Sequence, residues 1–155
     1  GQAALVLGAG GAAKAAALAL AQAGCRVTVC ARTPEKAAAL AARCGGVTVS
    51  WEDLPRAAAE HGLLLNATPL GMEGSPEFES LDFVQALPTK AVVYDLVYHP
   101  TDTALLRAAG SRELTAVGGL ALLVQQAALA FAYFTGIVPD AALCRDILQE
   151  LEAAQ

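Results

Sequence analysis

The sequence predicts an α/β domain built on a doubly wound, mostly parallel sheet of six strands with helices on both faces. Short apolar runs alternate with helix-forming stretches along almost the whole chain, as they do in repeated βα units. The runs are apolar at consecutive positions, as strands buried on both faces require. The first run also leads directly into a cluster of glycines, which is typical of the first turn of such a sheet.

Four of the six expected strands lie in the first half of the chain. They are residues 5–7, 26–30, 47–49 and 63–65. A helix is expected from Gly11 to Ala23, where alanine is frequent, and Gly24 can end it in a left-handed conformation. Thr33 and Pro34 predict the start of the second helix, because threonine is a favoured N-cap and proline fits the first turn. A short third helix is expected over residues 54–60.

The second half of the chain contains the other two strands and three more helices. The strands are expected at residues 91–94 and 114–117. One helix is expected to end near residue 110, and two more are expected over residues 119–135 and 140–152. Thr101 or Asp102 can cap the first of these helices, and Asp140 can cap the last. Residues 71–80 are polar and rich in turn formers, so we expect a surface loop there.

The most apolar helix-forming stretch runs from Leu120 to Thr135. It is shorter than the roughly 18 apolar residues that a membrane-spanning helix needs, and Gln125 and Gln126 interrupt it at its centre. A helix that is apolar around most of its circumference is usually buried. We therefore expect this helix to be buried within protein.

Composition and charge argue against several classes of function. The chain of 155 residues is 55% hydrophobic and has a net charge of −5, so neither a disordered chain nor a nucleic-acid-binding surface is expected. The 4 cysteines lack the CxxC spacing of zinc sites, and no metal is expected. No signal peptide is evident, and scattered free thiols are typical of a reducing, cytoplasmic compartment. No membrane partner is expected.

The glycine cluster follows the first expected strand and reads Gly8-Ala9-Gly10-Gly11-Ala12-Ala13. Gly8, Gly10 and Ala13 fit the GxGxxG/A pattern of Rossmann-like dinucleotide-binding domains. In that pattern the first glycine allows a tight turn, the second lets a diphosphate approach the backbone, and the alanine lets the helix pack closely on the sheet. Amides at the helix N-terminus can then bind the diphosphate, helped by the helix dipole. Taken alone, the motif also fits FAD, S-adenosylmethionine or a turn that binds nothing.

The end of the second strand indicates which dinucleotide is bound. NAD-binding domains usually place Asp or Glu here to bind the ribose 2′-hydroxyl, but this chain has Arg32 in that region. The guanidinium can pair with a 2′-phosphate and stack on adenine, while Thr33 adds a hydroxyl and Lys36 a second positive charge. These residues predict NADP rather than NAD. The alternative is that Arg32 and Lys36 are solvated residues at a helix start.

Three further segments make a family resemblance specific. They read NATPLGM at residues 66–72, DLVYHPTDT at residues 95–103 and GGLALLVQQAALAFAYFTG at residues 118–136. Together with the glycine loop and the Ala-Arg-Thr sequence at residues 31–33, they resemble the C-terminal domain of shikimate dehydrogenase over most of the chain. The resemblance implies that residues 1–155 form the NADP-binding Rossmann domain of such an oxidoreductase.

The resemblance also implies which residues contact ligands. The residues expected at the cofactor are Gly8, Ala9, Gly10, Gly11 and Ala12 at the diphosphate, Arg32, Thr33 and Lys36 at the adenosine phosphate, Asn66 and Thr68 beside the ribose, and Leu96 and Gly119 at the nicotinamide end. Tyr98 and Gln126 match positions that hydrogen-bond shikimate. Without the resemblance, Asn66, Thr68, Tyr98 and Gln126 could equally be structural residues, because satisfied polar groups are common in folded chains.

The chain lacks the residues that carry proton transfer in this family, a Lys and an Asp of an N-terminal domain. Neither Lys14 nor Lys90 lies in such a motif. We therefore expect no catalytic residue in this chain, and an N-terminal substrate domain, absent from it, as its partner.

These expectations lead to a function for the whole enzyme. It would use NADPH to reduce 3-dehydroshikimate reversibly to shikimate, a step of the shikimate pathway in aromatic amino acid biosynthesis. The chain alone would bind NADP(H) without turning over substrate. The alternatives are an NAD-preferring quinate/shikimate dehydrogenase domain and a non-catalytic dinucleotide-sensing module.

Overall fold

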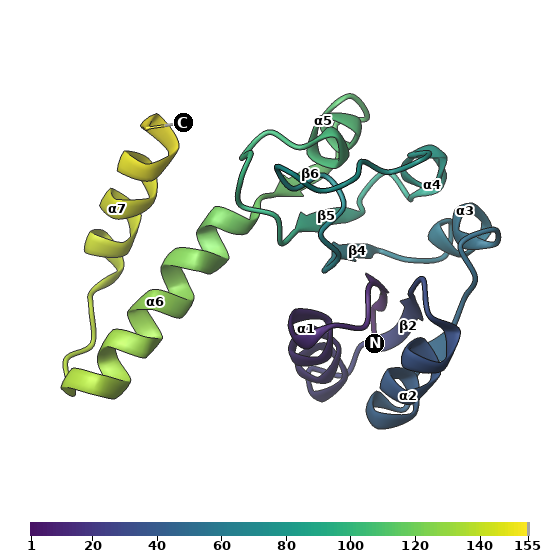
Figure 1. Cartoon of the computed structure of the whole chain (residues 1–155), viewed down its shortest axis with the longest axis horizontal. Helices are drawn as coiled ribbons and strands as arrows, with labels where there is room; N and C mark the ends of the chain where they lie inside the picture. The colour runs from purple at the N-terminus through teal and green to yellow at the C-terminus, as the bar shows by residue number, and fades with distance from the viewer. Residues whose placement is uncertain (155) are drawn as a thin grey trace.

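Six parallel strands form the centre of the computed structural model, which describes residues 1–154 (Figure 1). They are β1 (Ala3–Leu7), β2 (Arg26–Cys30), β3 (Val47–Thr48), β4 (Leu63–Asn66), β5 (Val92–Asp95) and β6 (Thr115–Val117). Their order in the sheet is β3-β2-β1-β4-β5-β6, and every neighbouring pair is parallel. The predicted doubly wound class is confirmed. Residue 155, the last residue of the expected domain, lies outside the described part.

Helices cover both faces of this sheet. Those within residues 1–154 are α1 (Gly11–Gln22), α2 (Pro34–Cys44), α3 (Leu54–Ala58), α4 (Asp82–Ala86), α5 (Ala104–Gly110), α6 (Gly119–Thr135) and α7 (Ala141–Ala153). Successive side chains of β1 point to opposite faces of the sheet, so their contacts show which helices cover each face. Leu5 and Leu7 pack in one core with α3, α4 and α5, whereas Val6 packs in a second core with α1 and α2. All three side chains are fully buried, so the sheet is covered on both sides.

Several helix ends follow the local sequence. Thr33 has the extended backbone of an N-cap before Pro34, although its side chain makes no capping bond. Gly45 ends α2 in the left-handed conformation at φ +64°. Asp140 caps α7, because its carboxylate accepts a hydrogen bond of 2.8 Å from the Leu143 amide. The starts of α2 and α7 depend on short-range sequence, which is why the prediction located them.

Two helices differ from the prediction. Thr103 caps α5, rather than Thr101 or Asp102, because its hydroxyl accepts a hydrogen bond of 3.2 Å from the Leu106 amide. The five-residue helix α4 has no counterpart in the prediction. Its buried side chains pack into the core beside α3. Such a short helix is stabilised by packing more than by helix propensity, and packing is hard to read from sequence.

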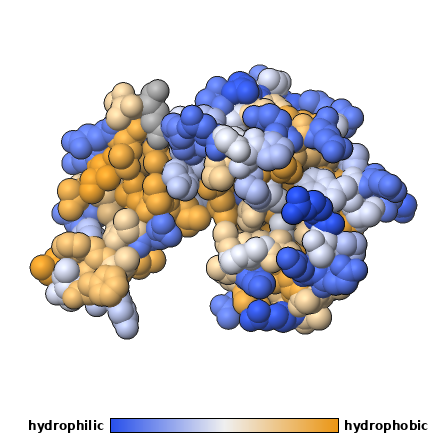
Figure 2. Space-filling model, viewed as in Figure 1, coloured by the Kyte–Doolittle hydropathy of each residue, from blue (hydrophilic) through white to orange (hydrophobic). Residues whose placement is uncertain are grey.

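The last two helices form a hairpin that extends away from the sheet (Figure 1). We call residues 119–153 the α6–α7 hairpin. The main contacts of α7 are with α6, and the residues buried in the two helices are Gly119, Leu120, Val124 and Cys144. The prediction that the apolar stretch from Leu120 to Thr135 is buried is therefore wrong for most of its length. Figure 2 shows apolar side chains gathered on the outside of the hairpin.

None of the helices within residues 1–154 combines the length and the apolar character needed to cross a membrane.

Candidate functional site

The predicted site residues follow the strands at one edge of the sheet. Because the strands are parallel, their carboxyl ends meet at this edge. Leu7 pairs with Cys30 on one side and with Asn66 on the other, and Asn66 pairs with Asp95. The chain continues from β1 to β2 in one direction and from β4 to β5 in the opposite direction. Doubly wound proteins bind ligands in the crevice beside such a reversal.

The glycine turn leaves β1 at this reversal. Gly8 has a φ of +110°, a conformation that side-chain-bearing residues rarely adopt. The turn also has no room for a side chain, since a Cβ on Gly8 would lie 2.8 Å from the carbonyl oxygen of Ala67. The Gly8 amide donates a hydrogen bond of 2.7 Å to the carbonyl of Cys30. The turn is therefore held between the ends of β2 and β4.

Gly10 and Gly11 present bare backbone to open space. A Cβ added to either glycine would meet no atom within 4 Å. Gly10 is the N-cap of α1 and no side chain caps this helix, so amides of the first turn are left for an external acceptor. Ala13, in contrast, is fully buried, which lets α1 pack closely on the sheet. This arrangement can receive an anion such as a diphosphate.

Arg32 and Lys36 carry exposed positive charges just beyond β2. Thr33 between them is half-buried at the start of α2. Within the described residues, neither cation forms an ion pair with a carboxylate. Arg32 also lines a hollow of about 650 Å³, whose walls include the apolar side chains of Trp51 and Phe78 and three carboxylates. The guanidinium is therefore available to a ligand that lies across the carboxyl edge.

A buried polar network joins β4 and β5 beside the glycine turn. The Asp95 carboxylate is fully buried and accepts a hydrogen bond of 2.9 Å from Asn66 Nδ2. It also accepts hydrogen bonds from the Thr103 hydroxyl at 2.7 Å and the Val97 amide at 3.1 Å. Burial raises the pKa of Asp95, and the hydrogen bonds from Thr103, Val97 and Asn66 oppose this rise.

The same network includes the side chains of Asn66 and Thr68, the two residues predicted to lie beside the ribose. The Oδ1 atom of Asn66 accepts hydrogen bonds from the amide of Thr68 at 3.0 Å and from its hydroxyl at 2.6 Å. The Thr68 hydroxyl also accepts a hydrogen bond of 3.2 Å from the Leu70 amide. Both side chains therefore organise the loop after β4, as their structural interpretation expects. That they also border a ribose stays a prediction.

Leu96 and Gly119 lie together although they follow different strands. The Gly119 amide donates a hydrogen bond of 3.1 Å to the carbonyl of Val97. A Cβ on Gly119 would lie 2.3 Å from the carbonyl oxygen of Leu96, so only glycine fits without a backbone shift. The first turn of α6 is thereby packed against the end of β5. These two residues were predicted for one end of the ligand, and the structure brings them into contact.

The two predicted substrate residues lie further out. Tyr98 is 46% exposed in the loop after β5. Gln126 is exposed on α6, about two helical turns beyond Gly119. No hydrogen bond joins the two side chains in the part of the chain that the structure describes. Both are open to a partner or ligand on the outer side of the carboxyl edge.

Asp95 and Thr103 are the site residues that the sequence analysis did not single out. They are 8 positions apart and both lie in the DLVYHPTDT segment. An acid at a strand end followed by a threonine at the start of a helix could have indicated their contact. The distance between strand end and helix start in space was still needed to establish it.

The edge offers no obvious nucleophile or metal site. Burial raises the pKa of the Cys30 thiol to about 12, so the thiol stays protonated near neutral pH. Across residues 1–154, no group of three or more His, Cys, Asp and Glu side chains is placed to hold a metal ion. The chemistry of the edge is therefore that of binding through amides, hydroxyls and guanidinium.

Fold and carboxyl edge together define a Rossmann-like α/β domain with a bare glycine turn at its switch point. Residues 1–73 match the family model described as shikimate/quinate 5-dehydrogenase, and residues 119–149 match that of the shikimate 5′-dehydrogenase C-terminal domain. The chain belongs to the shikimate/quinate dehydrogenase family. The resemblance inferred from the sequence motifs is thus confirmed.

Curated relatives are similar over nearly the whole chain. The shikimate dehydrogenase (NADP(+)) of Acidiphilium cryptum is 49% identical over 150 residues, which cover 96% of this chain and 54% of that protein. The enzyme of the same name from Methylocella silvestris is 50% identical over 131 residues, 83% of this chain and 46% of that protein. The chain therefore spans about half the length of the curated relatives it matches.

Solved structures also match nearly the whole of this chain and about half of their own length. The shikimate 5-dehydrogenase of Thermus thermophilus in complex with NADP(H) and shikimate has a TM-score of 0.80 and 40% identity, over 96% of this chain and 54% of that one. The quinate dehydrogenase of Corynebacterium glutamicum in complex with NAD has a TM-score of 0.85 and 30% identity, over 96% and 55%. These matches confirm the fold class.

Proposed function

We propose that this chain is the NADP(H)-binding domain of a shikimate dehydrogenase. The observation that carries the proposal is the bare glycine turn at the reversal of strand order. Beyond the neighbouring strand lies the guanidinium of Arg32, which forms no ion pair within residues 1–154. Backbone amides at a helix N-terminus suit a diphosphate, and a guanidinium suits a phosphate monoester. The relatives named shikimate dehydrogenase (NADP(+)) support the same cofactor.

In this proposal the ligand lies across the carboxyl edge of the sheet. The glycine turn of residues 8–12 binds the diphosphate through the amides that follow Gly8, because the Gly8 amide already donates to the Cys30 carbonyl. Arg32, Thr33 and Lys36 bind the adenosine phosphate. Leu96 and Gly119 meet the nicotinamide end. The close backbone approach of those two residues would make this part of the binding site rigid.

The substrate would be 3-dehydroshikimate, bound where Tyr98 and Gln126 face outward. NADPH supplies the hydride that reduces the ketone to the hydroxyl of shikimate. The residues of this chain bind and orient the two ligands and help to exclude water. The proton would come from a Lys–Asp pair of a second domain, which this chain does not carry, so the chain alone binds cofactor without turnover.

The Arg32→Ala substitution tests the cofactor assignment. Loss of a charged hydrogen bond costs about 1.5–3 kcal/mol, so NADPH affinity should fall about tenfold or more. NADH affinity should fall less, because NADH has no 2′-phosphate and can lose only the stacking on adenine. Isothermal titration calorimetry with both cofactors measures this. Arg43→Ala, at the other end of α2, is the matched control and should leave both affinities unchanged. A folded chain that takes up no NADPH at millimolar concentration would refute the proposal.

An NAD-preferring quinate/shikimate dehydrogenase domain is the second candidate. The quinate dehydrogenase in complex with NAD has a TM-score of 0.85 with this chain, so the fold accommodates either family branch. Tighter binding of NADH than of NADPH by the natural chain would favour this candidate. A chain that binds dinucleotide but never supports turnover, even when joined to a substrate domain, would instead be a sensing module.

A further inference from the structure

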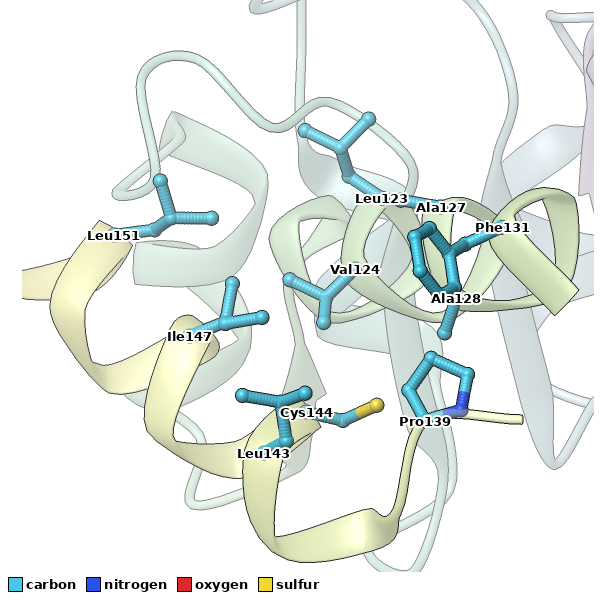
Figure 3. Close-up of a pocket in the computed structure, with 10 residues that line it drawn as sticks. All are labelled: Leu123, Val124, Ala127, Ala128, Phe131, Pro139, Leu143, Cys144, Ile147 and Leu151. Atoms are coloured by element: carbon cyan, nitrogen blue, oxygen red, sulfur yellow. The ribbon is translucent and has the colours of Figure 1, made fainter. Parts of the chain in front are cut away.

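Few contacts hold the start of α6 beside the sheet. The main neighbour of α6 is α7, and the two helices face each other across an apolar hollow of about 490 Å³ (Figure 3). Apart from the Cys144 thiol, the side chains that line this hollow carry no polar atom. The hollow therefore has little with which to orient a polar ligand. The position of α6 beside the candidate site depends on the residues at its start, of which Gly119 and Leu120 are buried.

The first turn of α6 rests on the backbone of Leu96 and Val97. The Gly119 amide donates a hydrogen bond of 3.1 Å to the Val97 carbonyl. A Cβ on Gly119 would lie 2.3 Å from the carbonyl oxygen of Leu96 and 2.7 Å from that of Val97, so no free space separates the two backbones. A shift of residues 96–97 would therefore move the start of α6 as well.

The Asp95 side chain holds the same segment from its buried side. Its Oδ1 atom accepts hydrogen bonds from the Val97 amide at 3.1 Å and from Asn66 Nδ2 at 2.9 Å. Its Oδ2 atom accepts a hydrogen bond of 2.7 Å from the Thr103 hydroxyl. One oxygen atom therefore sets the spacing between the end of β4 and the loop after β5, while the other holds the start of α5.

Burial makes this arrangement hard to deform. The Asp95 side chain is fully buried, and no cationic side chain within residues 1–154 forms an ion pair with it. A buried carboxylate without a cation is costly unless hydrogen bonds satisfy it, and hydrogen bonds to an ionised acceptor are stronger than neutral ones. The three donors cannot move away from Asp95 without leaving this buried group unsatisfied.

We propose that Asp95 is a positioning residue for the nicotinamide end of the cofactor, acting through Val97 and the start of α6 without touching the ligand. This inference rests on the proposed function, which places the nicotinamide at Leu96 and Gly119. All the hydrogen bonds described for the carboxylate go to other segments of the protein, so its action on a ligand is indirect.

The adenosine phosphate end should depend on Asp95 much less. Arg32 and Lys36 follow β2, and in the sheet both β1 and β4 lie between β2 and β5. The glycine turn is likewise held by contacts of its own with Cys30 and Ala67. A change at Asp95 should therefore act on one end of a bound dinucleotide and spare the other.

Two ligands separate the two ends in the isolated chain. NADPH reaches both, whereas adenosine 2′,5′-bisphosphate keeps a phosphate for Arg32 and one for the glycine turn but lacks the nicotinamide riboside. Asp95→Ser has a shorter side chain, which withdraws the oxygen shared by Asn66 and Val97. By isothermal titration calorimetry, its affinity should be at least about fivefold lower for NADPH and changed by less than about twofold for the bisphosphate. Asp95→Asn can keep the shared oxygen and should recover most of the NADPH affinity.

Leu105→Ala is the control for a general loss of stability. Leu105 is buried in α5, close in sequence to Thr103, and its truncation leaves a cavity in the core. This variant should unfold more easily and still bind both ligands as the natural chain does. A purely structural role of Asp95 would make Asp95→Ser behave in the same way.

Two results would overturn the positioning role. One is an NADPH affinity of Asp95→Ser that is unchanged or falls only as far as the bisphosphate affinity. The other applies even if Asp95→Ser does not fold, because it uses the natural chain and amide hydrogen exchange read by nuclear magnetic resonance. NADPH should slow exchange at Val97 and Gly119 more than the bisphosphate does, since coupling between two sites is reciprocal. Equal protection by the two ligands would contradict the proposal.

The same titrations distinguish this proposal from the proposed function. A natural chain that binds neither ligand would refute the cofactor assignment itself. A natural chain that binds NADPH, together with an Asp95→Ser variant that binds it equally well, would leave the cofactor assignment standing and refute the positioning role alone.

Discussion

At the scale of single residues, glycine serves two opposite purposes at the carboxyl edge. Gly8 and Gly119 lie where a Cβ would meet a carbonyl oxygen at 2.8 Å and 2.3 Å, so they allow two backbones to approach closely. Gly10 and Gly11 lie in open space, so they leave room for something outside the protein. The GxGxxG/A pattern predicts this difference between Gly8 and Gly10, whereas the close approach at Gly119 emerges only in the folded chain. Asp95 is the other decisive residue, because its buried carboxylate ties three segments together.

Replacing Asp95 with asparagine should change how stability depends on pH. Burial raises the pKa of Asp95 in the folded chain above its ordinary value of 3.8, so the folded chain holds the proton more tightly than the unfolded chain. The resulting stabilisation is present below pH 3.8 and is lost as pH rises through the higher folded pKa. The unfolding free energy of the natural chain minus that of Asp95→Asn should therefore decrease over this window.

Urea unfolding at a series of pH values measures this difference. A difference that stayed constant with pH would show that the Asp95 carboxyl titrates as it does in the unfolded chain.

At the scale of helices, two capping residues hold their helices in different surroundings. The Thr103 hydroxyl caps α5 and also donates to the buried Asp95 carboxylate. The Asp140 carboxylate caps α7 in an exposed position, on a hairpin that the sheet scarcely covers. The sequence located Asp140 because a local signal decides it. It missed Thr103 because the choice between neighbouring residues 101, 102 and 103 depended on where β5 ends in space.

Thr103→Ala should destabilise the whole domain, whereas Asp140→Ala should loosen α7 alone. The first change removes a cap and one of the donors to a buried carboxylate, for an expected loss of about 2–3 kcal/mol in the free energy of unfolding. The second removes an exposed cap worth about 1 kcal/mol. Urea unfolding measures the first and amide hydrogen exchange in α7 the second. Thr103→Ser keeps the hydroxyl and should recover most of the loss; equal losses for Ser and Ala would contradict the role of the hydroxyl.

At the scale of the whole molecule, the chain divides into a sheet with two well-buried cores and a hairpin that is largely exposed (Figures 1 and 2). Leucine shows the contrast. Leu64 of β4 is fully buried between the helices and strands of one core, while Leu129 of α6 is 72% exposed. Global stability should therefore come from the sheet, and the hairpin should contribute chiefly when something covers it.

Leu64→Ala and Leu129→Ala test this division with the same chemical change. Removing a buried leucine side chain costs about 2–5 kcal/mol, because it leaves a cavity as well as losing apolar burial. At an exposed position the effect should stay within about 0.5 kcal/mol. Chemical denaturation of the two variants measures both. Similar losses at the two positions would mean that the hairpin belongs to the same cooperative unit as the sheet.

The amino-acid sequence by itself predicts the alternation of strands and helices, the doubly wound class, the glycine turn and the family resemblance. Each depends on composition, short periodicity or fixed spacing, which act over a few neighbouring residues. Only the tertiary structure decides three other features, which are the network around Asp95, the cap at Thr103 and the exposure of α6. They depend on which distant segments meet, and a run of apolar residues is buried only if another surface reaches it.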